Sequence, residues 1–134
     1  MEGIIDTSVL VDYILPESQR HEKAKEAMGK IDRGFLPTVV VEELVYVLER
    51  LEFDKKAINE KIRQVLDSYD LLGVSAANIA GSASYIMEEN GATFRQFEDK
   101  LILSIAKDEG MALLTFDKRL AKECKAHGVK LLYE

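Results

Sequence analysis

Cysteine, histidine and tryptophan are scarce in this sequence of 134 residues, which has one cysteine, two histidines and no tryptophan. Cys124 alone cannot form an internal disulfide, so we expect a reducing, cytoplasmic setting. The cysteine and histidine residues show no spacing typical of a zinc site. Glycine-rich phosphate-binding motifs and the nucleophile elbow of serine hydrolases are also missing. These absences leave the carboxylates as the main candidates for chemistry.

Long hydrophobic runs are missing too. No stretch of about 18 apolar residues occurs, so we expect no membrane-spanning helix and no membrane partner. The apolar residues from Gly3 to Val11 are interrupted by Asp6 and follow no basic region, which argues against a signal peptide.

Acidic residues outnumber basic ones by 24 to 18, giving a formal net charge of −6. Such a chain has no general attraction for nucleic acids, so binding RNA or DNA would require local Lys/Arg clusters and bound cations. Hydrophobic residues make up 47% of the sequence. This is enough for the core of one domain, which we expect to span residues 1–134.

Short apolar runs alternate with amphipathic segments, a pattern that predicts an α/β fold with a parallel sheet. Polar residues and glycines that begin or end helices separate many of the segments, including a capping box at Thr93 and Gln96 and a stop at Gly110. The predicted strands cover residues 3–5, 35–36, 71–74, 111–115 and 129–133. The predicted helices cover residues 8–15, 16–32, 38–53, 55–69, 75–90, 93–109 and 117–128.

Two predicted strands end in a similar way, "GIIDTS" and "ALLTFD". Ligands of open α/β sheets bind beyond the carboxyl ends of the strands, where Asp6 and Asp117 are expected. Each residue could instead simply cap the helix that follows. The pairing of the two acids favours a site.

Two further candidates lie on predicted helices. In "TVVVEELVYVL", Glu43 lies roughly 110° from the centre of the apolar stripe and Glu42 roughly 150° away, at about 100° per residue. Glu43 is therefore the better candidate to line a cleft, although both could be ordinary acids of a first helical turn.

The helix "QFEDKLILSIAKDEG" carries an inward-facing charge. Its helical spacing places Glu98 and Asp99 on the apolar side in the first turn, and Lys100 and Ser104 on the opposite, polar side. A carboxylate that faces inward is costly unless a cation or a lysine pairs with it. This helix therefore predicts a charged site.

Four converging carboxylates raise one another's pKa and are normally held by hard divalent cations. Mg²⁺ or Mn²⁺ in such a cluster can activate water and bind phosphate oxygens. We therefore expect metal-assisted hydrolysis of phosphodiester bonds.

Four segments, in this order and spacing, resemble the PIN-domain family, specifically the VapC-type toxins of toxin–antitoxin pairs. They are "IIDTSVLVDYI", "TVVVEELVYVL", "FEDKLILSIAKDEGMALLTFD" and the short closing strand. The resemblance implies a three-layer α/β/α fold with a five-stranded parallel sheet of order 3-2-1-4-5. It also implies an Mg²⁺- or Mn²⁺-dependent endoribonuclease that cleaves RNA, usually a homodimer, with a cognate antitoxin that blocks the site.

The same resemblance implies roles for individual residues. Asp6, Asp99 and Asp117 match metal ligands of the family, and Glu43 matches an acid that binds metal directly or through water, or orients the attacking water. Thr115 and Ser8 match polar residues that often lie near the metal. Glu98, beside Asp99, could share the role of its neighbour. The bulky "LILSIA" departs from the usual alanine-rich turn, and we expect it to alter packing rather than chemistry.

Contacts with substrate and partner are less specific in the sequence. Four basic residues near the two C-terminal acids could contact phosphates, although such residues are usually solvated surface: Arg95, Lys100, Lys118 and Arg119. The segment from Val39 to Tyr69 could form a groove for an antitoxin helix, or its apolar residues could simply be core.

Several other functions fit parts of the pattern. A housekeeping RNA-processing nuclease would share the acids, and a non-catalytic PIN-like binding module would be expected to have lost some of them. A phospho-receiver domain requires an acidic pair after the first strand and an Asp after the third, and neither is present. A phosphatase of the haloacid-dehalogenase type requires an Asp at the position of Ser8.

Overall fold

The structure, a computed structural model, describes residues 1–133. Helices and strands alternate along most of the chain, as the hydrophobic pattern predicts. In chain order the elements are β1 (Glu2–Ile5), α1 (Thr7–Ile14), α2 (His21–Met28), β2 (Arg33–Pro37), α3 (Thr38–Arg50), α4 (Lys55–Ser68), β3 (Asp70–Leu72), α5 (Ala76–Glu88), the 3₁₀ turn η1 (Phe94–Gln96), α6 (Phe97–Glu109), β4 (Ala112–Leu114) and α7 (Lys118–Ala126).

The sheet has four parallel strands in the order β3-β2-β1-β4. The predicted order is confirmed for these strands, but the prediction of a full fifth strand is wrong. Only Leu131 of that segment pairs with β4, through a parallel bridge to Leu113. The Leu113 N–H donates to the Lys130 carbonyl at 2.9 Å, and the Leu132 N–H donates to the Leu113 carbonyl at 3.0 Å. The three-residue β4 offers little edge for a longer partner.

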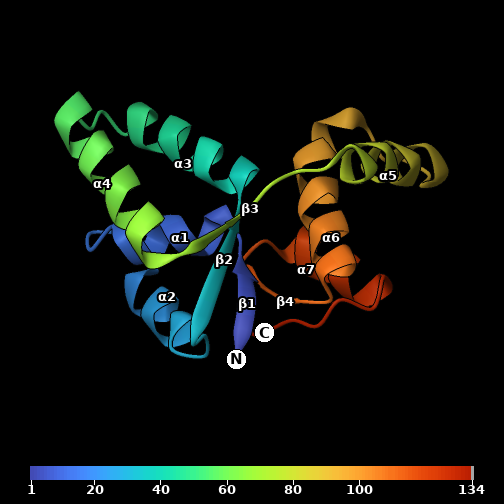
Figure 1. The fold of residues 1–134 in the computed structure, drawn as a ribbon, viewed down its shortest axis with the longest axis horizontal. Coiled ribbons are helices and arrows are strands. Elements are labelled where there is room, and N and C mark those ends of the chain that lie inside the picture. Colours follow the sequence, from blue (N-terminus) through green and yellow to red (C-terminus); the bar gives the residue numbers. More distant parts are fainter. Residues whose placement is uncertain (134) are drawn as a thin grey trace.

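Helices cover both faces of the sheet, which gives the predicted three-layer α/β/α arrangement (Figure 1). The strands accordingly read as continuous apolar runs, as expected when both faces are buried. Ile4 and Ile5 of β1, Leu36 of β2 and Leu113 and Leu114 of β4 are fully buried.

The helix ends agree with the sequence where local signals are strong. The capping box at Thr93 and Gln96 is formed, and Gly110 ends α6 in the left-handed conformation at φ 63°. The predicted helix over 16–32 is wrong in extent, because α2 spans only His21–Met28. The side chains of Ser18 and Arg20 bind Asp12 instead, which holds this segment as turns.

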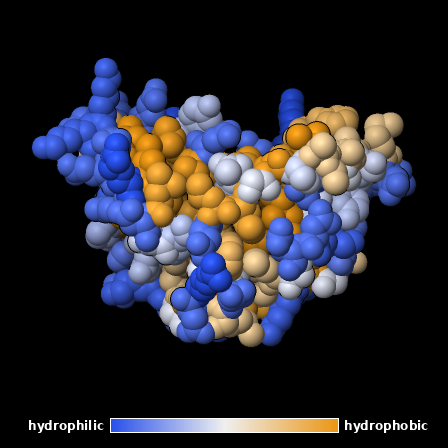
Figure 2. All heavy atoms as spheres, in the orientation of Figure 1, coloured by the Kyte–Doolittle hydropathy of each residue, from blue (hydrophilic) through white to orange (hydrophobic). Residues whose placement is uncertain are grey.

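Figure 1 shows α3 and α4 projecting to one side of the strands and α5 and α6 to the other. The strands point with their carboxyl ends towards the space between these two pairs of helices. On the same view, hydrophobic residues form a band that runs from the α3–α4 side across the middle of the molecule (Figure 2). None of the helices within residues 1–133 has the length and apolar character needed to cross a membrane.

Candidate active site

Asp6 and Asp117 leave the sheet at neighbouring strands. Asp6 directly follows β1, and Asp117 follows β4 after a two-residue loop. The two strands pair with Ile5 opposite Leu114, and the Asp6 N–H donates to the Leu114 carbonyl at 2.9 Å. The two acids therefore emerge at the same edge of the sheet, as their positions after parallel strands predict.

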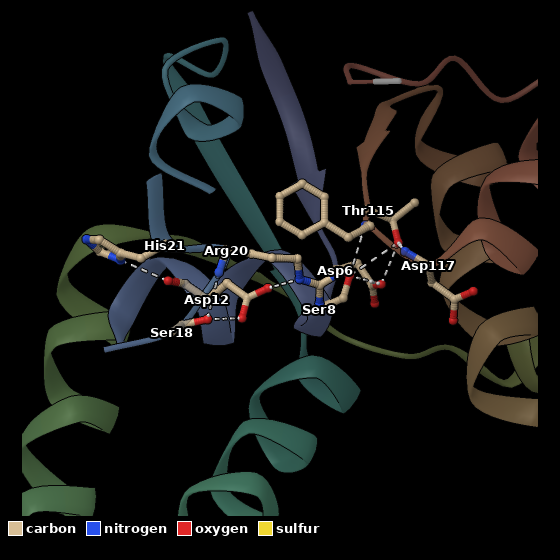
Figure 3. Close-up of polar contacts among 9 residues, drawn as sticks. Asp6, Ser8, Asp12, Ser18, Arg20, His21, Thr115 and Asp117 are labelled. Atoms are coloured by element: carbon tan, nitrogen blue, oxygen red, sulfur yellow. Dashed lines mark hydrogen bonds and ion pairs between the residues drawn. The ribbon is translucent and has the colours of Figure 1, made fainter. Parts of the chain in front are cut away.

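Two hydroxyl groups hold the carboxylate of Asp6, which is only 6% exposed. The Thr115 Oγ1–H donates to Asp6 Oδ2 at 2.7 Å, and the Ser8 Oγ–H donates to the same oxygen at 3.0 Å (Figure 3). Each hydroxyl oxygen in turn accepts a backbone N–H of the loop after β4, from Asp117 and Phe116 respectively, both at 3.0 Å. Ser8 and Thr115 thus tie this loop to the start of α1.

The capping interpretation holds for one of the two strand-end acids. Asp6 precedes α1, but its side chain makes no capping hydrogen bond. Asp117 does cap α7: its Oδ1 accepts the N–H groups of Arg119 at 2.9 Å and Leu120 at 3.2 Å. Helix capping therefore does not explain why an acid stands at the end of β1.

Glu43 of α3 reaches the same site. Glu43 is half-buried and Glu42 is exposed, as their helical positions predict. Burial contributes most to raising the pKa of Glu43 to about 7, and a hydrogen bond to Glu98 adds to the effect. The charges of Asp6 and Asp99 raise it further. Such effects require short separations, so Glu43, Asp6 and Asp99 share one environment.

Asp99 lies in the first turn of α6 and is also half-buried. Burial raises the pKa of Asp99 to about 6, with contributions from the charges of Asp117 and Asp6. Burial likewise raises the pKa of Asp6 more than its hydroxyl donors lower it. Glu98 of the same turn is exposed and meets the site through Glu43. The expectation that Glu98 and Asp99 both face inward is therefore met by Asp99 alone.

The donor set suits a hard divalent cation. Every candidate ligand offers carboxylate oxygen, which Mg²⁺ and Mn²⁺ prefer. The raised pKa values of Asp6, Glu43 and Asp99 reflect an excess of buried negative charge that a cation would relieve. Among the described residues no three Asp, Glu, His or Cys side chains are already gathered closely enough to hold a metal ion. The acids share a site without forming a closed cage.

Of the four basic candidates, Lys100 is placed differently from its prediction. The prediction of a polar outer face at Lys100 and Ser104 is wrong, because Lys100 is 0% exposed and Ser104 is 6% exposed. The Lys100 Nζ binds Glu89 Oε2 at 2.5 Å and Glu123 Oε1 at 2.9 Å. It is therefore not available to a phosphate.

The other three basic candidates are exposed. The charge of Arg119 lowers the pKa of the Asp99 carboxyl and so opposes the effect of burial. Arg119 therefore lies near Asp99. Lys118 lines a cavity together with Asp117. Arg95 is in η1, one turn before α6.

Two acids differ from the sequence interpretation. Asp12 has no partner acid in the sequence pattern and would be expected at the surface, but it is 9% exposed, and its Oδ2 lies 2.9 Å from Arg20 Nε. Figure 3 shows this cluster beside the Asp6 network. Glu123 of α7 was not singled out, yet it binds Lys100 and its charge raises the pKa of Asp99. A buried lysine needs such a partner, but the sequence pattern places Lys100 on a polar face and so gave no signal for Glu123.

Comparisons with known proteins agree on the fold. Residues 4–126 match the model of the PIN domain family. No curated protein sequence matches the chain significantly.

Several solved structures are similar to this chain. Mycobacterium tuberculosis VapC20, described as a sarcin–ricin loop cleaving toxin, superposes with a TM-score of 0.77 at 16% identity, covering 92% of this chain and 95% of its own. A toxin–antitoxin complex from Klebsiella pneumoniae gives 0.72 at 19% identity over 98% of both chains. FitAcB from Neisseria gonorrhoeae gives 0.70 at 22% identity, covering 100% of this chain and 97% of its own.

Proposed function

Because this chain belongs to the PIN domain family, we propose that it is a metal-dependent endoribonuclease that hydrolyses phosphodiester bonds in RNA. The observation that carries the proposal is the electrostatic coupling of Asp6, Glu43, Asp99 and Asp117 at the carboxyl edge of the sheet. Clusters of this kind serve phosphoryl chemistry through bound divalent cations.

The acids would divide the work of holding the cation. Asp6, Asp99 and Asp117 would bind Mg²⁺ or Mn²⁺, and Glu43 would bind it directly or through water. When bound, the cation supplies an activated water and neutralises charge on the phosphate.

Other residues of the site support the reaction. Ser8 and Thr115 keep the Asp6 carboxylate in one orientation through their hydrogen bonds to Oδ2. Glu43, which is half-buried beside Glu98, would bind the cation or help to orient the attacking water. Arg119, whose charge acts on Asp99, would contact a phosphate oxygen.

We test the proposal with Asp6→Asn and Asp99→Asn, each of which removes a charged ligand while conserving size. Both variants should lose Mg²⁺-dependent cleavage of single-stranded RNA by more than about 100-fold, since even outer-shell partners of metal ligands contribute about 10- to 100-fold. Asp67→Asn, at an exposed position on α4, is the matched control and should cleave normally. Full activity of either site variant, with circular dichroism that shows an intact fold, would refute the mechanism.

We further propose that the protein is a toxin with a protein antitoxin, that it works in the cytoplasm and that it forms a homodimer. The named toxin VapC20 and the toxin–antitoxin complex from Klebsiella pneumoniae share its fold. The chain also exposes large apolar side chains that suit contacts with partners, namely Tyr46, Leu51, Leu66, Leu71, Ile79, Met87 and Phe94.

The homodimer is tested by light scattering on the purified protein. We expect twice the monomer mass of 15.1 kDa. A monomer mass at all concentrations would contradict the dimer and leave the nuclease proposal untouched.

A further inference from the structure

A cavity of about 370 Å³ lies beside the loop that carries Asp117. Four lysines line it: Lys118, Lys122 and Lys125 from α7, and Lys23 from α2. The aromatic rings of Phe116 and Tyr133 form part of its wall. The chain as a whole has a net charge of −6, so these lysines form a local region of positive charge.

The helical spacing aligns the α7 lysines on one face. Lys118, Lys122 and Lys125 follow each other at intervals of four and three residues, with the small Ala121 between them. Residues at these intervals are neighbours on a helix surface. Lys118 and Lys122 are separated by roughly 6 Å along the helix axis, at about 1.5 Å per residue. This rise is comparable with the separation of neighbouring phosphates in an extended single strand.

Aromatic rings hold Lys23 in the cavity without neutralising it. The Lys23 Nζ lies 4.8 Å from the centroid of the Phe116 ring and 5.6 Å from that of Tyr133. The two rings meet edge to face, with centroids 5.8 Å apart. A cation–π contact positions an ammonium group but leaves its full charge available to an anion.

Three of the cavity lysines have no acidic partner among the described residues. Within residues 1–133, Lys23, Lys118 and Lys122 form no ion pair. Asp117 is the only acid among the described residues that line the cavity, and its carboxylate caps α7. Among the described residues, Lys23, Lys118 and Lys122 therefore give this part of the surface an excess of positive charge.

The cavity and the acidic site share one loop. Thr115, whose hydroxyl binds Asp6, and Asp117 both line the cavity. A strand whose scissile phosphate lies at the acids would therefore pass the lysines within a few nucleotides.

We propose that this cavity is a subsite for single-stranded RNA, which binds the phosphates that flank the bond to be cleaved. The inference rests on the proposed nuclease function and deepens it. The lysines supply affinity along the backbone, and the adjoining acids supply the chemistry. Because phosphate contacts carry no base information, the subsite positions the strand without selecting its sequence.

The test measures binding separately from cleavage. A fluorescein-labelled 12-nucleotide oligouridylate is titrated with Asp99→Asn protein, with and without the double substitution Lys23→Gln/Lys122→Gln, over a series of salt concentrations. The double substitution should weaken binding about 25-fold at 0.1 M salt and make the log–log salt slope shallower by about 1.4, since each single-strand phosphate contact contributes about 0.7. Lys55→Gln/Lys56→Gln removes the same charge from exposed positions on α4 and should leave the slope unchanged.

Equal salt slopes for the cavity variant and the α4 control would overturn the subsite. Polyglutamate that binds the cavity more tightly than the oligonucleotide would also overturn it, in favour of an acidic protein partner. Cleavage assays on otherwise wild-type protein separate the two proposals. If RNA is cleaved with the same KM by the cavity variant, the subsite fails while the nuclease stands. If wild-type protein binds RNA through the lysines but never cleaves it with Mg²⁺ or Mn²⁺, the nuclease fails while the subsite stands.

Discussion

At the scale of single residues, the carboxylate of Asp6 is the most deeply buried of the four candidate ligands. Its two hydroxyl donors favour the charged form, yet burial outweighs them and raises its pKa. Glu43 and Asp99 show the same direction of shift. Without a cation, the ionised carboxylates therefore lower the stability of the folded protein. Such strongly shifted pKa values are typical of functional sites.

This cost predicts how stability depends on pH. The pKa of Glu43 is raised from 4.5 to about 7 and that of Asp99 from 3.8 to about 6. The folded protein then binds more protons than the unfolded chain between about pH 4 and pH 7, so stability in the absence of divalent cations falls as the pH rises through this window.

Glu43→Gln isolates the contribution of one acid. Because glutamine cannot ionise, the variant should gain stability relative to wild type as the pH rises from 5 to 8, measured by urea unfolding in EDTA. The neighbouring exposed Glu42→Gln controls for the loss of charge and should follow the wild-type pH dependence. A Glu43→Gln curve parallel to wild type would contradict a raised pKa at this residue.

The sequence predicts part of the site at this scale. The sequence predicts that Asp6 and Asp117 lie close together because both follow parallel strands. It predicts that Glu43 lines the same cleft because of its angle on a helix. The burial of Asp12 could not be foreseen, since it depends on contacts from Ser18 and Arg20 across a turn. Side-chain partners in loops have no periodicity to reveal them.

At the scale of elements, α6 shows where helical periodicity is insufficient. Its predicted polar face is covered by α5, whose Asn78 Nδ2 donates to Ser104 Oγ at 3.2 Å and to Asp108 Oδ2 at 2.6 Å. A helix needs a polar stripe where it faces solvent, and equally where it forms polar contacts with a neighbouring helix. The pattern alone cannot tell such a contact from solvent, so the placement of α5 was needed to locate Lys100.

The ion cluster around Lys100 joins three helical regions. Lys100 belongs to α6, Glu123 to α7, and Glu89 directly follows α5. The two carboxylates offset the effect of burial and raise the pKa of Lys100, which keeps it charged. The cluster therefore fixes the first turn of α6, which carries Asp99, against α7, which follows Asp117.

Lys100→Met should destabilise the protein strongly. Methionine fills the same space but leaves Glu123, with only 11% of its side chain exposed, without a cationic partner, and breaking a buried pair costs about 3–5 kcal/mol. Lys107→Met, on the same helix but exposed, should cost less than about 0.5 kcal/mol. Urea unfolding at neutral pH compares the two, and equal stabilities would show that the cluster contributes nothing.

At the scale of the whole molecule, the sheet gathers acids from distant parts of the chain. Asp6 follows the inner strand β1 and Asp117 follows its edge neighbour β4, while Glu43 and Asp99 come from helices that project to opposite sides (Figure 1). The parallel topology was predictable from alternating apolar and amphipathic segments. The reduction of the last strand to one bridge was not, because it reflects how short β4 is.

The central claim is that these acids form a divalent-cation site, and anomalous diffraction from a crystal soaked in Mn²⁺ tests it most directly. We predict a manganese peak bounded by the carboxylates of Asp6, Asp99 and Asp117, with Glu43 bound directly or through water, and no such peak in Asp99→Asn crystals. Manganese bound only elsewhere on the molecule, with these four carboxylates unoccupied, would contradict the account.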